Sequence, residues 1–405
     1  MSRLPWLLAL VLLAGTASAA AAQAPPQGVE VTQLPAPDAF TAPGRDTGLP
    51  PSLWTGASAK TAKTVLPLLA AKPLSPAAAA LARRILATGA PGPRDTGRDP
   101  ALAAARANAL MFQGDPKAAA AVLARAPGLD RNSDLARAAA ESMLLSGDDQ
   151  RACQLAESLS VGREEVYWLK LRTYCQATAG QAAQAQLTFD LVQAQVKDPI
   201  FTRLMGAKLA GSGNPGAPSL RNGLDYALSR NLGLDLAAAK PSPAVAAALS
   251  SGDPAPPTLD PASTPEHLAP LAEALARNEP VRDAVIAALV ETAGSTEPKA
   301  RARGQAALLL AVAVSGASSP EVRGQIAGLS VPDGRAPLGR SVALESAAEQ
   351  KLMGEAALLS LWTCAEAGAA GPAIGDRVRI VRALHAVGLD ADARAMALEG
   401  LLGLK

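Results

Sequence analysis

The chain has 405 residues, of which 49% are hydrophobic but only 3% are aromatic, so alanine and leucine supply most of its apolar side chains. Alanine is the strongest helix former, whereas a sheet protein would need more valine, isoleucine and aromatic residues, so the composition favours an all-α protein. The 38 basic and 36 acidic residues nearly balance, which gives no reason to expect a nucleic-acid partner.

Residues 1–22 have the layout of a secretory signal peptide. Arg3 provides a positive charge, an apolar run follows from Leu4 to Ala14, and small residues come next. The apolar run is shorter than the roughly 20 residues that span a bilayer. We therefore expect cleavage after one of Ala19, Ala22 and Ala24, location in the periplasm or outside the cell, and no membrane insertion afterwards. An uncleaved anchor is the alternative.

Residues 23–52 are rich in proline and polar residues, and they predict a disordered leader. Order is expected to begin near Leu53 and Trp54. The segments "SPAAAALARRILATG" and "DPALAAARANALMFQG" each place a capping residue and a proline before a helical run, and each run stops at a glycine. Together they predict two helices that begin at Pro76 and Pro100.

Three of the predicted helix ends repeat at a fixed interval of 33 residues. The repeated positions are a glycine and, five residues later, an alanine: Gly114 and Ala119, Gly147 and Ala152, Gly180 and Ala185. A period of this length is typical of repeat architectures. The glycine permits a left-handed turn at the end of one helix, and the alanine lets the next helix cross at close range. Each such hairpin needs a neighbour to cover its apolar face, so the hairpins should stack.

The Gly-x4-Ala pattern resembles the tetratricopeptide repeat over roughly residues 100–200. Leu110 and Met143 match the large residue that the family places four positions before the glycine, whereas Gln176 does not. Ala103, Ala136 and Leu169 stand where the family usually has tryptophan. The resemblance implies an α-solenoid of antiparallel helical hairpins. The segments "SLWTG", "ACQLAESL" and "YWLKLRTYCQATAG" are also similar to exported, alanine-rich bacterial proteins without an assigned activity.

The remaining chain divides at a proline-rich stretch. We expect a helical repeat domain over residues 53–235, a linker over 236–266 with a short helix at 243–250, and a C-terminal domain of helical hairpins over 267–405. In the last pair of predicted helices, Gly388 and Ala393 repeat the glycine–alanine spacing.

The chain has three cysteines. Cys153 and Cys175 fall at similar heights on two consecutive antiparallel helices, and an oxidising compartment would allow a disulfide between them. Two buried free thiols are the alternative. Cys364 is expected to be a buried apolar residue.

The search for catalytic chemistry returns few candidates. His267 and His385 are far apart in the chain and lack the spacing of metal ligands. Glu141-Ser142 and Glu345-Ser346 match the dipeptide used by wall-cutting muramidases, although no lysozyme-like domain accompanies them. We therefore assign no catalytic, cofactor-binding or metal-binding residue.

The function expected from these observations is a periplasmic scaffold that binds a peptide or a protein partner in the cell envelope, because repeat superhelices form extended concave surfaces. The alternatives are a peptidoglycan-modifying envelope enzyme or its regulator, and a structural protein of the envelope.

Overall fold

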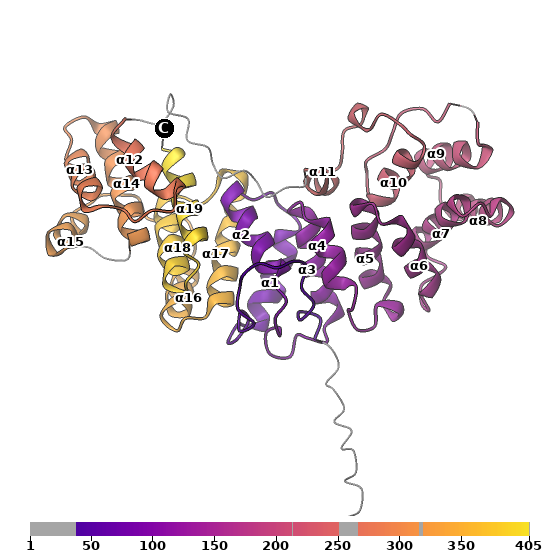
Figure 1. Ribbon diagram of the computed structural model, residues 1–405, viewed down its shortest axis with the longest axis horizontal. Coiled ribbons are helices and arrows are strands. Elements are labelled where there is room, and N and C mark those ends of the chain that lie inside the picture. Colours follow the sequence, from indigo (N-terminus) through magenta and orange to yellow (C-terminus); the bar gives the residue numbers. More distant parts are fainter. Residues whose placement is uncertain (1–37, 213, 251–265, 316–318, 405) are drawn as a thin grey trace, which may run out of the picture. The chain divides into compact units, whose positions relative to one another are not determined.

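The computed structural model describes residues 38–212, 214–250, 266–315 and 319–404. The regular secondary structure of these residues is helical, and none of them lies in a β-strand (Figure 1). The all-α class predicted from the composition is thereby confirmed. No helix in the described ranges combines the length and the apolar character needed to cross a bilayer. The predicted signal peptide, residues 1–22, lies outside the described residues.

Nineteen α-helices are found along the described ranges, with short 3-10 helices between some of them. Their bounds are α1 Ala59–Leu69, α2 Pro76–Ala87, α3 Pro100–Phe112, α4 Pro116–Leu123, α5 Ser133–Ser146, α6 Asp149–Ser158, α7 Val166–Thr178, α8 Ala182–Gln195, α9 Pro199–Ala210, α10 Gly223–Asn231, α11 Pro243–Leu249, α12 Ala269–Ala276, α13 Asp283–Ala293, α14 Pro298–Ser315, α15 Pro320–Ala327, α16 Leu338–Glu349, α17 Met353–Ala367, α18 Ile374–Ala386 and α19 Asp390–Leu402.

Several helices begin with the capping residue and proline that the sequence predicts. The Asp99 carboxylate accepts hydrogen bonds from two backbone N–H groups in the first turn of α3, at 3.1 and 3.2 Å. The Asp115 carboxylate caps α4 in the same way by accepting from Ala118 N–H at 3.0 Å. Helix α2 begins at Pro76, but Ser75 holds the capping position without a side-chain hydrogen bond to the helix. These caps satisfy backbone donors that have no partner within the helix.

The glycines of the 33-residue period end α3, α5 and α7. Gly114, Gly147 and Gly180 have φ values of +90°, +85° and +76°, a region that glycine adopts without steric cost. In each case the next residue donates its N–H to the carbonyl four residues before the glycine, at 2.8 to 2.9 Å. The alanines five residues later are completely buried: Ala119, Ala152 and Ala185. The three turns therefore share one geometry, and each leads into a helix that packs closely on the previous one.

The helices from α3 to α8 pack against their neighbours in sequence order. Helix α4 contacts both α3 and α5, α6 contacts both α5 and α7, and α7 contacts α8. Helices α3 and α5 also contact each other directly. The same turn recurs between α18 and α19, where Gly388 has a φ of +81° and Ala393 is 1% exposed.

The chain after α9 returns to pack on α3 and α5. Helix α10 lies against α5, where Gly223 N–H donates to the Glu141 carboxylate at 2.6 Å. Helix α11 contacts both α3 and α5, and a Cβ atom on Gly114 would lie 2.5 Å from the Ala247 carbonyl oxygen. Val245 of α11 is only 2% exposed. The chain therefore covers part of the surface of α3 and α5 with its own helices.

The prediction of a disordered leader up to residue 52 is wrong for residues 38–52. Phe40 is completely buried and contacts Trp54 edge to face, with ring centroids 5.8 Å apart. The Arg106 guanidinium, also completely buried, donates hydrogen bonds to four backbone carbonyls, and those of Ala39 and Ala42 belong to this segment. A composition-based prediction misses this order because one aromatic ring and one distant arginine provide it.

The predicted boundary at residues 236–266 does not separate two domains. The described residues belong to one compact unit, and α1 and α2 pack against α17 and α19 (Figure 1). The Glu355 carboxylate of α17 accepts from Ser58 N–H at 2.8 Å and from the Thr61 hydroxyl at 2.7 Å. The Glu399 carboxylate of α19 accepts from Ala77 N–H at 2.8 Å. The short helix predicted at 243–250 is α11, and residues 251–265 lie outside the described residues.

Candidate functional site

A groove between α14, α15, α16 and α18 has a volume of about 600 Å³. Helix α18 contacts both α14 and α16, so it forms the floor of the groove and the other two helices form its walls. Helix α15 contacts α14 and adds to that wall. The cavity is open to solvent and has the size of pockets that hold a ligand or a segment of another protein.

The surface of the groove is mainly apolar. The apolar side chains come from four helices: Leu309, Val312, Ala313, Ile326, Ala348, Val378, Ala383 and Ala386. Of these, Ala313, Ala348 and Ala383 are buried, and the others remain partly accessible. An apolar surface of this kind on a folded chain is typical of an interaction site.

One stripe of α16 continues this apolar surface. Leu338, Val342, Glu345 and Glu349 are spaced by four, three and four residues, so they lie on one face of the helix. Leu338 is 77% exposed and Val342 is 56% exposed, which makes them two of the few large apolar side chains that the described residues leave in solvent. The opposite face of α16 is buried. The stripe therefore presents apolar side chains in its first half and carboxylates in its second half.

The charged side chains at the edge of the groove differ in how they are paired. Arg379 of α18 makes ion pairs with Asp333 and Asp376, and Lys351 donates to the Ala386 carbonyl at 2.6 Å. His385 lies 2.5 Å from Asp390 through Nδ1.

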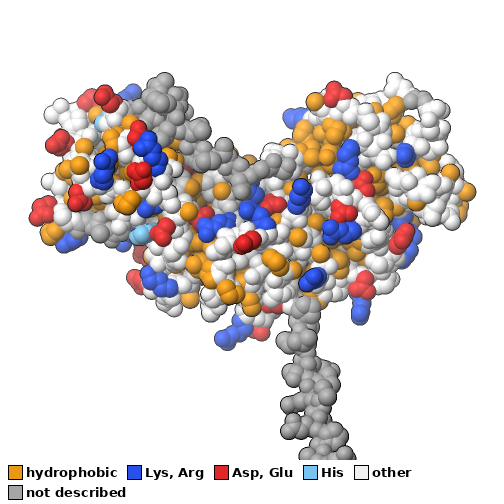
Figure 2. All heavy atoms as spheres, viewed as in Figure 1, with side chains coloured by type: hydrophobic (Ala, Val, Ile, Leu, Met, Phe, Trp, Pro, Cys, Tyr) orange, Lys and Arg blue, Asp and Glu red, His pale blue; other side chains and the backbone are white. Residues whose placement is uncertain are grey.

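By contrast, three charged side chains of the groove make no hydrogen bond or ion pair with any other described residue. They are Glu345 and Glu349 on α16, and Arg382 on α18. On the face drawn in Figure 2, basic and acidic side chains are interspersed, in agreement with the net charge of +2. Local pairs rather than a broad field would therefore select what binds to such a surface.

The structure contains the disulfide that the cysteine positions predict. Cys153 of α6 and Cys175 of α7 are bonded, and their Cα atoms are 5.5 Å apart. Cys364 is buried and free, and burial raises the pKa of its thiol to about 12. The bond joins two consecutive helices that belong to different hairpins of the stack.

The two glutamates considered as muramidase acids occupy different environments. Glu345 is an exposed residue of the groove, as described above. The Glu141 carboxyl group is buried between α5 and α10, and burial raises its pKa although Gly223 N–H donates to it. A raised pKa suits a general acid, but Glu141 does not line the groove. Its hydrogen bond instead holds the start of α10.

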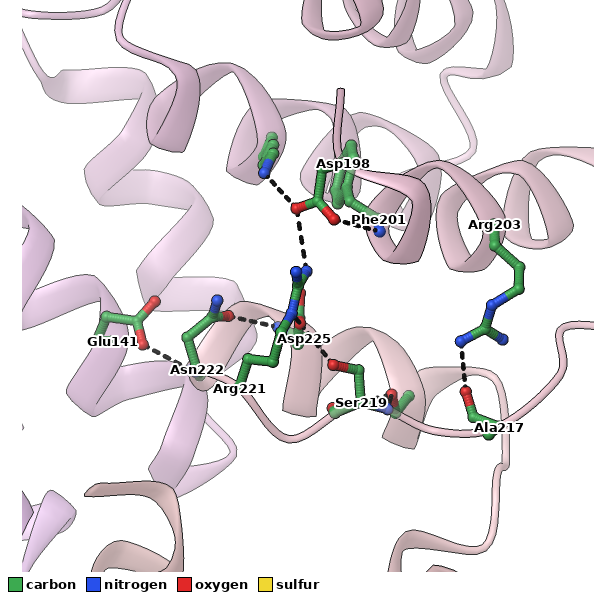
Figure 3. Close-up of polar contacts among 12 residues, drawn as sticks. Glu141, Asp198, Phe201, Arg203, Ala217, Ser219, Arg221, Asn222 and Asp225 are labelled. Carbon is green, nitrogen blue, oxygen red and sulfur yellow. Dashed lines mark hydrogen bonds and ion pairs between the residues drawn. The ribbon is translucent and has the colours of Figure 1, made fainter. Parts of the chain in front are cut away.

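A network of ions lies next to Glu141 and fixes the same helices (Figure 3). Asp198 accepts from Lys170 at 2.7 Å and from Arg221 at 3.0 Å, and Arg221 also bonds Asp225 at 2.5 Å. Burial opposes ionisation of Asp198, but the hydrogen bonds from Arg221 and Lys170 lower its pKa overall. These contacts join α7, α9 and α10 and have a structural role.

The two histidines are not brought together, since His267 lies in a 3-10 helix before α12 and His385 lies in the last turn of α18. Within the residues that the structure describes, no group of three or more His, Cys, Asp or Glu side chains is placed to hold a metal ion.

Sequence reasoning missed the groove, because the groove exists only where four separate helices pack together. The four-three-four spacing of the α16 stripe was the available signal. Comparison of the chain with protein-family models, curated proteins and solved structures found no significant match. The groove is therefore the feature of the molecule from which a function can be inferred.

Proposed function

We propose that the chain is an exported helical-repeat scaffold of the cell envelope, which holds a segment of a partner protein in the groove between α14, α15, α16 and α18. The observation that carries this proposal is the groove itself, with its apolar floor and the exposed Leu338 and Val342 beside it. Solvent exposure of these side chains is unfavourable by about 25 cal/mol per Å² of apolar surface, and a partner segment would remove that surface from water.

The tetratricopeptide-like arrangement forms part of this proposal. The shared turns at Gly114, Gly147 and Gly180 and the sequential packing of α3 to α8 support it. Helices α10 and α11 already cover part of α3 and α5. The C-terminal groove is therefore the better candidate for a partner than the surface of the repeats.

Export is proposed from the predicted signal peptide, and the disulfide between Cys153 and Cys175 is the supporting structural feature. Disulfides persist in oxidising compartments such as the periplasm and are rare in the cytosol. Cell fractionation should recover the mature chain outside the cytoplasm, with its new N-terminus between residues 20 and 25. Recovery of the intact chain in the cytoplasm would contradict this part of the proposal.

The scaffold role is tested by placing a photo-crosslinking amino acid in the groove of the full chain in its native cells. Val378 in the groove and Val342 on the adjoining face of α16 are the positions of choice, and Leu187 on α8 is the matched control because it is 66% exposed but lies on a different helix. We expect the same discrete adduct from Val378 and Val342 and its loss when Ile326→Asp places a charge in the groove. No adduct at either of these two positions, or the same adduct at Leu187, would overturn the proposal.

A further inference from the structure

We propose that the segment held in this groove is an amphipathic helix of another protein, with an apolar ridge and two basic residues about one turn apart that pair with Glu345 and Glu349. This inference rests on the scaffold function proposed above and specifies the chemistry of its partner.

The arrangement of the groove favours a helix as the occupant. Helices α14 and α16 both contact α18, and the open space that these helices line has a volume of about 600 Å³. The stripe of α16 runs from Leu338 to Glu349, about 16 Å at 1.5 Å per residue, which corresponds to three helical turns. A helix satisfies its own backbone hydrogen bonds, whereas a partner that binds as a β-strand would need a strand edge, and the described residues contain none.

The apolar ridge of the partner follows from the floor and from the first half of the stripe. Leu338 and Val342 are exposed on the same face of α16 as Glu345, which lines the groove together with Val312 of α14 and Val378 of α18. Apolar residues at positions i, i+3 or i+4, and i+7 of the partner would contact this surface.

The basic pair follows from the charges that the chain leaves without partners. On α18 and in the turn after α16, Arg379, Lys351 and His385 all have partners within the chain. Glu345 and Glu349 have no ion-pair partner among the described residues. Both belong to the α16 wall of the groove, and they are one helical turn apart. Two lysines or arginines at the same spacing on the partner would meet both carboxylates.

Arg382 on the floor is the remaining charge of the groove without a described partner. It lies on α18 rather than on the α16 wall, so an acidic residue on another side of the partner would pair with it. The expected partner therefore has an apolar ridge between a basic flank and an acidic position, and this pattern fixes its orientation.

The probe for this inference is a synthetic 15-residue peptide with capped ends and a fluorescent label. It carries leucines at helical spacing, two lysines one turn apart on one flank and a glutamate on the other. A second peptide has glutamates in place of the two lysines. Binding to the full chain is measured by fluorescence anisotropy at low salt, because exposed ion pairs are screened at high salt.

Three variants of the chain distinguish the contributions. The double variant Glu345→Lys/Glu349→Lys reverses the acidic wall. The double variant Glu164→Lys/Glu291→Lys changes the net charge equally at two exposed positions outside the groove, in the turn before α7 and on α13. Val342→Asp tests the apolar contact, and since Val342 is 56% exposed, the substitution should leave folding unaffected.

We expect the lysine peptide to bind the wild-type chain and the Glu164→Lys/Glu291→Lys control equally. Reversal of the acidic wall should weaken that binding about tenfold or more and should make the glutamate peptide the better ligand, because attraction is replaced by repulsion at two sites.

If Val342→Asp abolishes binding of both peptides while the wall reversal has no effect, the groove is a docking site but the inferred charge pattern is wrong. If neither peptide binds the wild-type chain, the helical partner is refuted, whereas the scaffold function still depends on the crosslinking result. If the wild-type chain is a dimer and Val342→Asp is a monomer by sedimentation, the occupant is a second copy and the inference is wrong.

Discussion

The disulfide between Cys153 and Cys175 provides a quantitative test of how the helical stack is held together. The bond closes a loop with a sequence separation of 22 residues between α6 and α7. In the chain-entropy model, opening a loop of this length adds about 3 kcal/mol of conformational freedom to the unfolded state at 25 °C. Replacing both cysteines with alanine should therefore destabilise α6 and α7 by about 3 kcal/mol.

The fold should survive this change, because other contacts also hold these helices. The Tyr174 hydroxyl donates to the Asp149 carboxylate at 2.6 Å, and Arg230 bonds the same carboxylate at 2.6 Å. The loss of the bond is then measurable as a difference in stability rather than as a failure to fold.

Native-state hydrogen exchange followed by mass spectrometry is the appropriate assay, because an array of this size need not unfold in a single step. A loss of about 3 kcal/mol corresponds to a decrease of about 100-fold in the protection of amides in α6 and α7, since each 1.4 kcal/mol is a factor of ten. Peptides from α17 and α18 should keep their protection. Reduction of the wild-type chain, which retains both sulfur atoms, should reproduce the effect of the double substitution.

The entropic reasoning would be refuted if reduction and the double substitution both left the protection of α6 and α7 within about threefold of the oxidised wild type. That result would mean that α6 and α7 stay packed on each other in the partly unfolded state from which their amides exchange. The disulfide would then not restrict the conformational freedom of that state.

Three further predictions concern single positions. Gly114→Ala should lower the free energy of unfolding in urea by more than about 2 kcal/mol, because the residue has a positive φ and the added Cβ would lie 2.5 Å from a backbone carbonyl oxygen. Gly180→Ala should lower it by only about 1 kcal/mol, because Gly180 has a positive φ but open space around it. Arg106→Met should leave four backbone carbonyls without their donor, lower stability by about 3 kcal/mol or more, and expose residues 38–50 to tryptic cleavage. Because burial raises the pKa of Glu141 above 4.5, the unfolded chain ionises this carboxyl first, so Glu141→Gln should gain stability relative to wild type as the pH rises above about 4.5. A pH-independent difference in stability would contradict this.

The parts of the fold that depend on local sequence were predictable. Capping aspartates followed by proline set the starts of α3 and α4, and the glycines at the 33-residue period set three turns of identical geometry. The cysteine pair followed from the same reasoning, since the heights of Cys153 and Cys175 depend only on the lengths of two helices and the turn between them. In each case residues close in the chain determine the outcome.

The parts that depend on distant contacts were not predictable from patterns. Order in residues 38–52 comes from Arg106 and from the packing of Phe40 on Trp54, and neither contact leaves a periodic signal. The packing of α11 on α3 depends on the close approach of the α11 backbone to Gly114. The sequence offered no sign of this contact, because the turn at the end of α3 already accounted for a glycine at that position. The candidate groove combines four helices of the C-terminal part, so its existence is a property of their packing rather than of any single segment.

The carboxylates of α17 and α19 that bond the starts of α1 and α2 also affect the order in which the molecule can be completed. Glu355 lies 297 residues after the Ser58 N–H that it accepts from, and Glu399 lies 322 residues after that of Ala77. A ribosome makes these first two helices well before the groups that finish them. The backbone N–H groups at the starts of α1 and α2 therefore lack these carboxylate partners while most of the polypeptide is synthesised. The last residues to leave the ribosome supply the hydrogen bonds that the first helices lack.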